Sequence, residues 1–189
     1  MSKIEDDYEV EDITKNIKNK KIKSGSKGKR GERDIIHLFN NRFAKLLSEH
    51  SDWGGFSRSI GSGNRWGQVF SLPQHAKETF SGDITCPKNF KFVIESKCGY
   101  NDLDLFGCLI KNEKGLDEFL QQVSDDSLRC GKPPILIWKK DRKGRIAFIR
   151  EIDINFNKLT INYLKYNSWI GIDFNYLLSL EDNFFFNLN

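Results

Sequence analysis

The chain has 189 residues, and 30 lysines and arginines against 26 acidic residues give it a formal net charge of +4. Its hydrophobic residues, 38% of the total, can form a sizeable core, which excludes a wholly disordered protein, and its length suits one elaborated domain. No apolar run approaches the roughly 20 residues that span a bilayer, and the N-terminus lacks the apolar segment of a secretory signal, so we expect a soluble, intracellular, cytoplasmic protein with no membrane partner.

The charge is distributed unevenly, and most of the imbalance lies in the first thirty residues. Residues 1–12 carry six acids and one base, residues 13–30 carry eight bases and no acid, and the remainder sums to about +1. Gly, Ser and Lys at 24–28 are typical of flexible, solvated chain. We predict three parts, namely a flexible charged tail at 1–30, a folded core at 31–151, and an aromatic, strand-rich extension at 152–189 packed on that core.

Hydrophobic spacing predicts an α/β fold, a mixed central sheet flanked by helices. The elements expected in chain order are a helix at 32–50, an extended run at 56–60, strands at 83–86 and 89–97, a helix at 116–123, strands at 134–139 and 145–151, and extended stretches at 159–166 and 169–175. Residues 65–81 and 99–115 show no clear period and are interpreted as loops.

One constellation carries chemistry: Asp83, followed twelve residues later by Glu95 and Lys97. Side chains alternate along a strand, so Glu95 and Lys97 share a face, and a turn between the two predicted strands brings Asp83 alongside Glu95. Two carboxylates beside an amine suit Mg²⁺, which takes one or two carboxylates and keeps positions for water and phosphate oxygens. A solvated Glu–Lys pair is the ordinary alternative, but Phe90, Phe92 and Ile94 make this strand otherwise apolar.

A third carboxylate, Glu32, shares a helix stripe with Ile35, Ile36 and Phe39. Either it completes an acidic site, or it is a favourable charge in the first turn of a helix.

Other chemistries are not supported. The four cysteines, at 86, 98, 108 and 130, include no closely spaced pair of the kind that zinc fingers use, so we expect reduced thiols. Gly61-Ser62-Gly63 is not followed by the Lys-Ser/Thr of a phosphate-binding loop, so no nucleotide cofactor is expected.

Four segments in this order resemble the PD-(D/E)xK nuclease superfamily, and within it the archaeal-type Holliday junction resolvases. The segments are Lys27–Asp34, Arg58–Gly63, Gly82-Asp83 and Glu95-Ser96-Lys97, and the resemblance covers residues 27–139. Three features depart from the family's pattern: Gly82 stands where the family has a turn-forming proline, the stretch between Ser62 and Asp83 is longer, and the chain after residue 151 has no counterpart.

The resemblance implies roles for these residues. Asp83, Glu95 and the backbone carbonyl of Ser96 would bind the metal, Lys97 would position the attacking water, and Glu32 would complete the site, directly or through water. It implies Mg²⁺ as cofactor, with Mn²⁺ able to substitute.

DNA is the implied partner, and basic side chains are the candidates for contacting it. Candidate contacts, which include one serine near the scissile bond, are Lys27, Lys29, Arg30, Arg33, Arg58, Ser62 and Arg65. Ordinary surface charge is the alternative for Arg58 and Arg65, and a solubilising tail is the alternative for the basic stretch at 13–30. Gln121 and Gln122 could approach the site or lie on a solvated helix face.

The sequence thus predicts a Mg²⁺-dependent endonuclease that hydrolyses DNA phosphodiester bonds. The resemblance further implies a homodimeric, junction-resolving enzyme of DNA recombination and repair. Two alternatives stay open at this point, a restriction-type or repair nuclease acting on duplex DNA or its ends, and a non-catalytic DNA-binding protein.

Overall fold

The computed structural model describes residues 24–59, 73–103, 105–111, 114–155 and 160–188. Within them, one sheet has the strand order β1-β2-β3-β4-β5-β7-β6. The strands are β1 (Ser57–Arg58), β2 (Ile84–Thr85), β3 (Val93–Cys98), β4 (Pro134–Lys139), β5 (Arg145–Arg150), β6 (Leu164–Tyr166) and β7 (Trp169–Asp173). β3 and β4 run parallel and the other neighbours run antiparallel, so the sheet is mixed.

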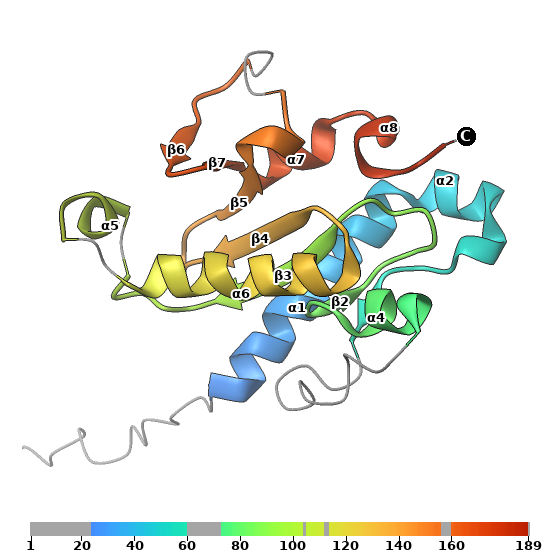
Figure 1. Ribbon diagram of the computed structural model, residues 1–189, viewed down its shortest axis with the longest axis horizontal. Helices are drawn as coiled ribbons and strands as arrows, with labels where there is room; N and C mark the ends of the chain where they lie inside the picture. Colours follow the sequence, from blue (N-terminus) through green and yellow to red (C-terminus); the bar gives the residue numbers. More distant parts are fainter. Residues whose placement is uncertain (1–23, 60–72, 104, 112–113, 156–159, 189) are drawn as a thin grey trace, which may run out of the picture.

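Helices cover both faces of this sheet (Figure 1). They are α1 (Ser24–Arg42), α2 (Ala44–Glu49), α4 (Gln74–Phe80), α5 (Leu105–Lys111), α6 (Lys114–Cys130), α7 (Phe174–Ser179) and α8 (Asp182–Phe185), with short 3-10 turns η2 (Ser51–Trp53) and η3 (Glu151–Asp153). The predicted fold class, a mixed sheet flanked by helices, is confirmed.

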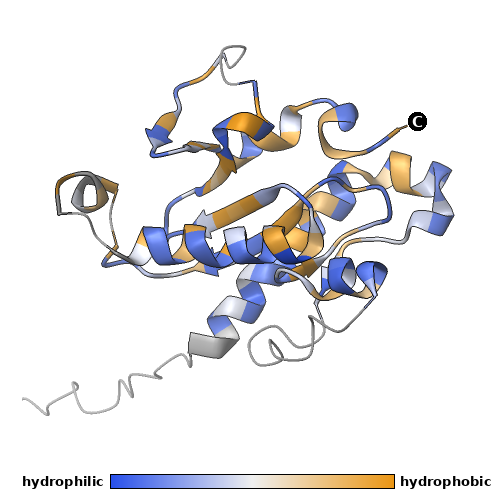
Figure 2. Ribbon diagram, viewed as in Figure 1, coloured by the Kyte–Doolittle hydropathy of each residue, from blue (hydrophilic) through white to orange (hydrophobic). Residues whose placement is uncertain are grey.

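The core lies in two layers, one on each side of the sheet. α1, α7 and α8 pack on one face through side chains such as Phe39 and Phe174. α5 and α6 pack on the other through side chains such as Leu120 and Val123. β4 alternates between these layers: Ile135 and Ile137 face the first, whereas Leu136 and Trp138 face the second. The strand is buried on both faces and appears as a hydrophobic arrow in Figure 2.

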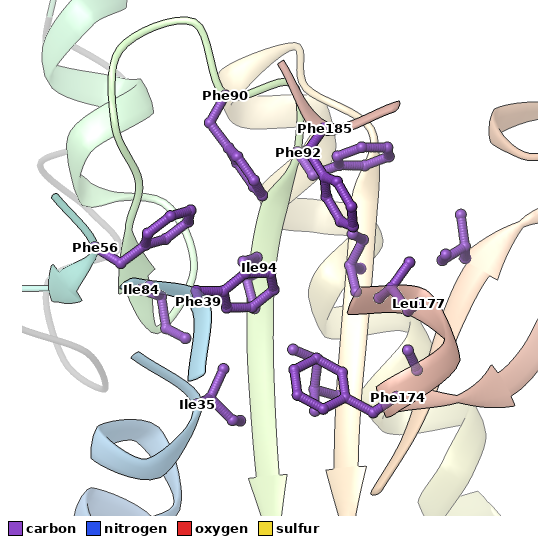
Figure 3. Packing of buried hydrophobic residues seen from close by; sticks show 14 of the residues in the cluster. Ile35, Phe39, Phe56, Ile84, Phe90, Phe92, Ile94, Phe174, Leu177 and Phe185 are labelled. Atoms are coloured by element: carbon purple, nitrogen blue, oxygen red, sulfur yellow. The ribbon is translucent and has the colours of Figure 1, made fainter. Parts of the chain in front are cut away.

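Aromatic rings fill the layer beneath α1. Phe39 is fully buried and stacks on Phe56 with 4.9 Å between ring centroids. It also meets Phe90 and Phe174 edge to face. Figure 3 shows these rings lying between α1, the start of β3 and α7. Because offset-stacked and edge-to-face rings add to burial, this packing fixes α1 against β3.

The chain differs from the prediction at several places. α1 begins at Ser24, so residues 24–30, predicted as part of a tail, are helical. The reason is tertiary: Gly31 packs so closely on the sheet that an added Cβ would lie 2.8 Å from Cys98 Cβ, and Lys27 pairs with Asp141. These contacts keep residues 24–30 helical, although their composition is that of a linker.

The two segments interpreted as loops each contain a helix, and the predicted 116–123 helix is longer. α4 lies within the segment at 65–81, and α5 lies within the segment at 99–115. α4 has no buried residue among its seven, so its sequence carries no hydrophobic period to recognise. The helix that follows, α6, extends from Lys114 to Cys130.

Two remaining features bear on the sequence analysis. None of the helices in the described residues is long and apolar enough to cross a membrane. All four cysteines are free thiols, and burial raises the pKa of Cys86 to about 12.

Candidate active site

Glu95 and Lys97 emerge from β3 on the face that α6 covers. Ile94, which directly precedes Glu95 on the strand, points to the opposite face, into the aromatic layer beneath α1. Glu95 is only 1% exposed. Lys97 Nζ lies 2.7 Å from Glu95 Oε1, so the two predicted catalytic side chains form a part-buried ion pair.

Asp83 is held beside this pair by two backbone hydrogen bonds to β3. Its own N–H donates to the carbonyl of Ile94 at 2.9 Å, and its Oδ2 accepts from the N–H of Ser96 at 3.0 Å. In a strand, the N–H and C=O of one residue point to the same edge. The Ser96 carbonyl therefore points toward the edge where Asp83 lies, as the prediction of a third metal ligand requires.

Gly82 makes this approach possible. Its φ is +73°, and a Cβ at this position would lie 2.5 Å from the Ile94 carbonyl oxygen. Proline is locked near a φ of about −65°, so it cannot adopt this conformation. Glycine is thus a structural requirement of this turn, and it does not simply stand in for the family's proline.

The carboxylates crowd each other. Burial and the neighbouring charge of Asp83 raise the pKa of Glu95 to about 8, although Lys97 opposes this. Burial also raises the pKa of Asp83, against the lowering effects of the Ser96 amide and Lys97. Burial lowers the pKa of Lys97, but attraction to Glu95 and Asp83 outweighs it and leaves a raised value. The site therefore stabilises added positive charge.

This electrostatic balance fits a divalent cation. The carboxylates of the buried Glu95 and the partly buried Asp83, with a backbone carbonyl, are the hard oxygen ligands that Mg²⁺ prefers. Among the described residues, no group of three or more His, Cys, Asp or Glu side chains is arranged to hold a metal ion. A metal here would therefore depend on Asp83, Glu95 and the Ser96 carbonyl, with water completing its coordination.

Gln122 of α6 reaches the site, and the reading of it as a solvated side chain is wrong. Its Oε1 accepts from Lys97 Nζ at 2.7 Å, and its Nε2 donates to Glu95 Oε1 at 2.5 Å. The neighbouring Gln121 is exposed and donates to Asp125 on its own helix. The sequence alone could not choose between two adjacent glutamines, because the choice depends on how α6 is rotated against β3.

Glu32 lies close enough to Asp83 for its charge to raise the pKa of that carboxyl. It is 8% exposed and accepts a hydrogen bond from Arg58 Nε at 2.5 Å. The first-turn explanation for Glu32 is wrong, because α1 begins at Ser24, eight residues earlier. Arg58 forms an ion pair with Glu32. Its contact with DNA stays a prediction.

Asp126 is a buried carboxylate that the sequence analysis missed. It lies on α6 one turn beyond Gln122, is fully buried, and accepts from Arg129 Nη2 at 2.5 Å. Burial raises its pKa, whereas Arg129 and the Gly82 amide lower it. It also contributes to the raised pKa of Glu95. A carboxylate four residues after Gln122, amid apolar helix positions, was the available signal.

The candidate DNA contacts other than Arg58 fall into two groups. Lys27, Lys29, Arg30 and Arg33 lie on the first turns of α1, which are hydrophilic in Figure 2, and all but Lys27 are exposed. Ser62 and Arg65 lie outside the described residues.

A protein-family model described as "Phage putative PDDEXK endonuclease" matches residues 23–181. The match extends well past residue 151, into the segment that has no counterpart in the resolvase pattern. β7, which pairs with β5 inside the central sheet, belongs to that segment. No curated protein and no solved structure matches the chain.

Proposed function

We propose that this chain, which belongs to the PD-(D/E)xK nuclease family, is a metal-dependent endonuclease that hydrolyses phosphodiester bonds in DNA. The observation that carries the proposal is the convergence of Asp83, just before β2, with Glu95 and Lys97 of β3 in one site. A surface ion pair would not require the left-handed glycine that precedes Asp83 or the glutamine that bridges Glu95 and Lys97.

Asp83, Glu95 and the Ser96 carbonyl would hold Mg²⁺, for which Mn²⁺ would substitute. The bound ion would lower the pKa of a water molecule and offset the negative charge that builds on the phosphoryl group. The ligands must be deprotonated to bind, so the proton that Glu95 holds below its raised pKa is released on loading. Glu32 contributes negative charge next to Asp83 and is placed to act through water.

Lys97 acts as a protonated donor. Its raised pKa keeps the amine charged at neutral pH, so it does not accept the proton of the attacking water. An ammonium group has three donors, and Glu95 and Gln122 take two of them. The third can orient the attacking water or meet a phosphate oxygen as its charge grows. Gln122 is a positioning residue, because it holds Lys97 and Glu95 without having to touch the substrate.

The finer assignment is a junction-resolving homodimer. It rests on the resemblance to archaeal-type resolvases and on the need for two sites to cut a four-way junction symmetrically. The basic face of α1 adjoins the site and suits a phosphate backbone, but it carries no information on DNA shape.

Cleavage assays on a four-way junction, a fork, a linear duplex and single strands, each with Mg²⁺ or EDTA, test both levels of the proposal. We expect Mg²⁺-dependent cutting, fastest on the junction, and its loss in Asp83→Asn and Lys97→Ala. Cutting of plain duplex at defined sites would favour a restriction-type enzyme. If none of the four substrates is cut in a metal-dependent way, a non-catalytic DNA-binding protein would be favoured.

A further inference from the structure

We propose that the turn between β4 and β5 is a second contact for the DNA phosphate backbone, beside the active site. We define the basic turn as residues 139–145. The inference rests on the proposed nuclease function and adds a surface that neither the sequence motifs nor the α1 side chains include.

The basic turn concentrates positive charge. Its seven residues, Lys-Lys-Asp-Arg-Lys-Gly-Arg, hold five bases and one acid, a net charge of +4. This equals the formal net charge of the whole chain. Such a density on one exposed turn attracts a polyanion.

Internal pairing accounts for some of these charges and leaves others available. Lys139 and Arg145 both pair with Asp34 of α1, at 3.5 and 3.3 Å. The one acid of the turn, Asp141, pairs with Lys27 of α1 and accepts from Asn101 at 2.7 Å. Within the described residues, neither Arg142 nor Lys143 has an ion-pair partner, and both are exposed. These two side chains are therefore available to an external anion.

The same pairs hold the turn in place. Asp141 accepts an N–H from the loop at 101 and donates its own N–H to Asn101 Oδ1 at 3.0 Å. Lys140 donates to the Leu103 carbonyl, and Lys143 N–H donates to the Lys140 carbonyl at 3.3 Å. Arg142 itself has a φ of +58°, a conformation uncommon for a residue with a side chain. The turn thus presents Arg142 and Lys143 from a fixed base.

The basic turn lies next to the catalytic strand. Cys98 on β3 pairs with Lys139 on β4, and Lys97 is the preceding residue of β3. The Gly99 N–H donates to the Lys139 carbonyl at 2.9 Å, which continues this pairing one residue further. The first turns of α1 adjoin the basic turn through the Lys27–Asp141 pair, and they carry the exposed Lys29 and Arg30. A DNA backbone entering the site can therefore meet both α1 and the basic turn.

The test compares the full-length wild-type protein with Arg142→Gln/Lys143→Gln. DNA binding is measured by fluorescence anisotropy in EDTA from 50 to 300 mM salt, on a four-way junction and a linear duplex. A lost phosphate contact lowers the salt slope by about 0.9 per charge, so we expect the slope to fall by nearly 2 and the affinity to fall roughly tenfold or more at 0.1 M salt. The loss should be similar on every DNA sequence, because phosphate contacts carry no sequence information.

Two control variants separate a local contact from a change in net charge. Lys45→Gln/Lys88→Gln removes two exposed lysines that lie near the C-terminal end of α1, whereas the basic turn lies near its N-terminal end. This variant should leave the salt slope unchanged. Arg142→Lys/Lys143→Arg keeps both charges and should restore wild-type binding. Circular dichroism spectra should agree for all variants, since the substituted side chains are exposed.

Single-turnover cleavage with Mg²⁺ at saturating protein keeps this inference distinct from the proposed function. We expect Arg142→Gln/Lys143→Gln to keep Mg²⁺-dependent cleavage once it is bound. An unchanged salt slope in a variant that still cuts would overturn the inference and leave the nuclease proposal intact. Normal binding by the wild type without any cleavage would overturn the nuclease proposal and leave the contact surface standing.

Discussion

The N–H of Ser96 donates a hydrogen bond of 3.0 Å to Oδ2 of Asp83, and this bond ties the residue that precedes β2 to β3, the strand that carries Glu95. It leaves the Ser96 carbonyl pointing to the same edge of β3. The atoms proposed to hold a cation are thus kept together by the protein's own hydrogen bond. Such preorganisation is what separates a metal site from two acids that happen to be adjacent.

Asp83→Asn should abolish cleavage and keep the fold. Asn Oδ1 can still accept from Ser96, but the site loses one of its two carboxylates and with it most of its affinity for Mg²⁺. Because the substitution also relieves repulsion with Glu95, we expect thermal unfolding in EDTA at a temperature equal to or above that of the wild type. Calorimetry and a Mg²⁺ titration of cleavage measure the two effects. Asp52→Asn, at an exposed position, is the matched control.

Gln122→Ala should slow the chemical step by roughly 10- to 100-fold, as loss of a partner that orients a site residue typically does. Lys97 would keep its hydrogen bond to Glu95 and lose the one to Gln122. With one bond left, the ammonium group can rotate, and its third N–H no longer has a fixed direction. We expect kcat to fall and KM to change little in steady-state cleavage. Gln121→Ala is the control on the adjacent, exposed position. Equal effects of the two substitutions would contradict the positioning role.

Gly82→Ala should destabilise the protein by about 3 kcal/mol or more. A side chain at positive φ costs about 1–2 kcal/mol, and forcing a methyl group into a packed position costs about 1–3 kcal/mol. Gly54→Ala separates the two causes, because Gly54 has the same φ of +73° with nothing within 4 Å of its added Cβ. Urea unfolding should show the Gly54 variant losing only the first contribution. A Gly82 variant no less stable than the Gly54 variant would refute the close approach to Ile94.

The pH dependence of stability should reveal Glu95. Its pKa is about 8 in the folded, metal-free site against an ordinary 4.5, so between these values the folded state binds the proton more tightly than the unfolded chain. This stabilisation is fully present below pH 4.5 and is lost as the pH rises through 8. In EDTA, the free energy of unfolding should therefore fall more steeply from pH 5 to 8 for the wild type than for Glu95→Gln.

Mg²⁺ should reverse that loss, because it binds the deprotonated carboxylates and stabilises only the folded state. We expect the rise in unfolding temperature on adding Mg²⁺ to be larger at pH 8.5 than at pH 6. Glu118→Gln, on the exposed face of α6, controls for the removal of one carboxylate. The same Mg²⁺ response in wild type and Glu95→Gln would rule Glu95 out as a ligand.

Hydrophobic patterning predicted the buried centre of the fold and failed at its periphery. The strand at 134–139 was predicted with the bounds it has, because a strand buried on both faces is apolar at every position. α4 has no buried residue, and the stretch at 24–30 is helical because of contacts with distant residues, so neither left a local signal. The division of the chain into tail, core and extension stays a prediction, although β7 pairs within the central sheet.

The sequence by itself determined the candidate catalytic residues on β3, since a charged pair two residues apart in an apolar strand is a local pattern. Only the tertiary structure decided what surrounds them. The rotation of α6 against β3 selected Gln122 over Gln121, and the pairing of α1 with the basic turn left Arg142 and Lys143 free of ion pairs among the described residues. The physical reason is that alternation along a strand is set by neighbouring residues, whereas contacts between elements depend on packing across a sheet that brings together residues far apart in the chain.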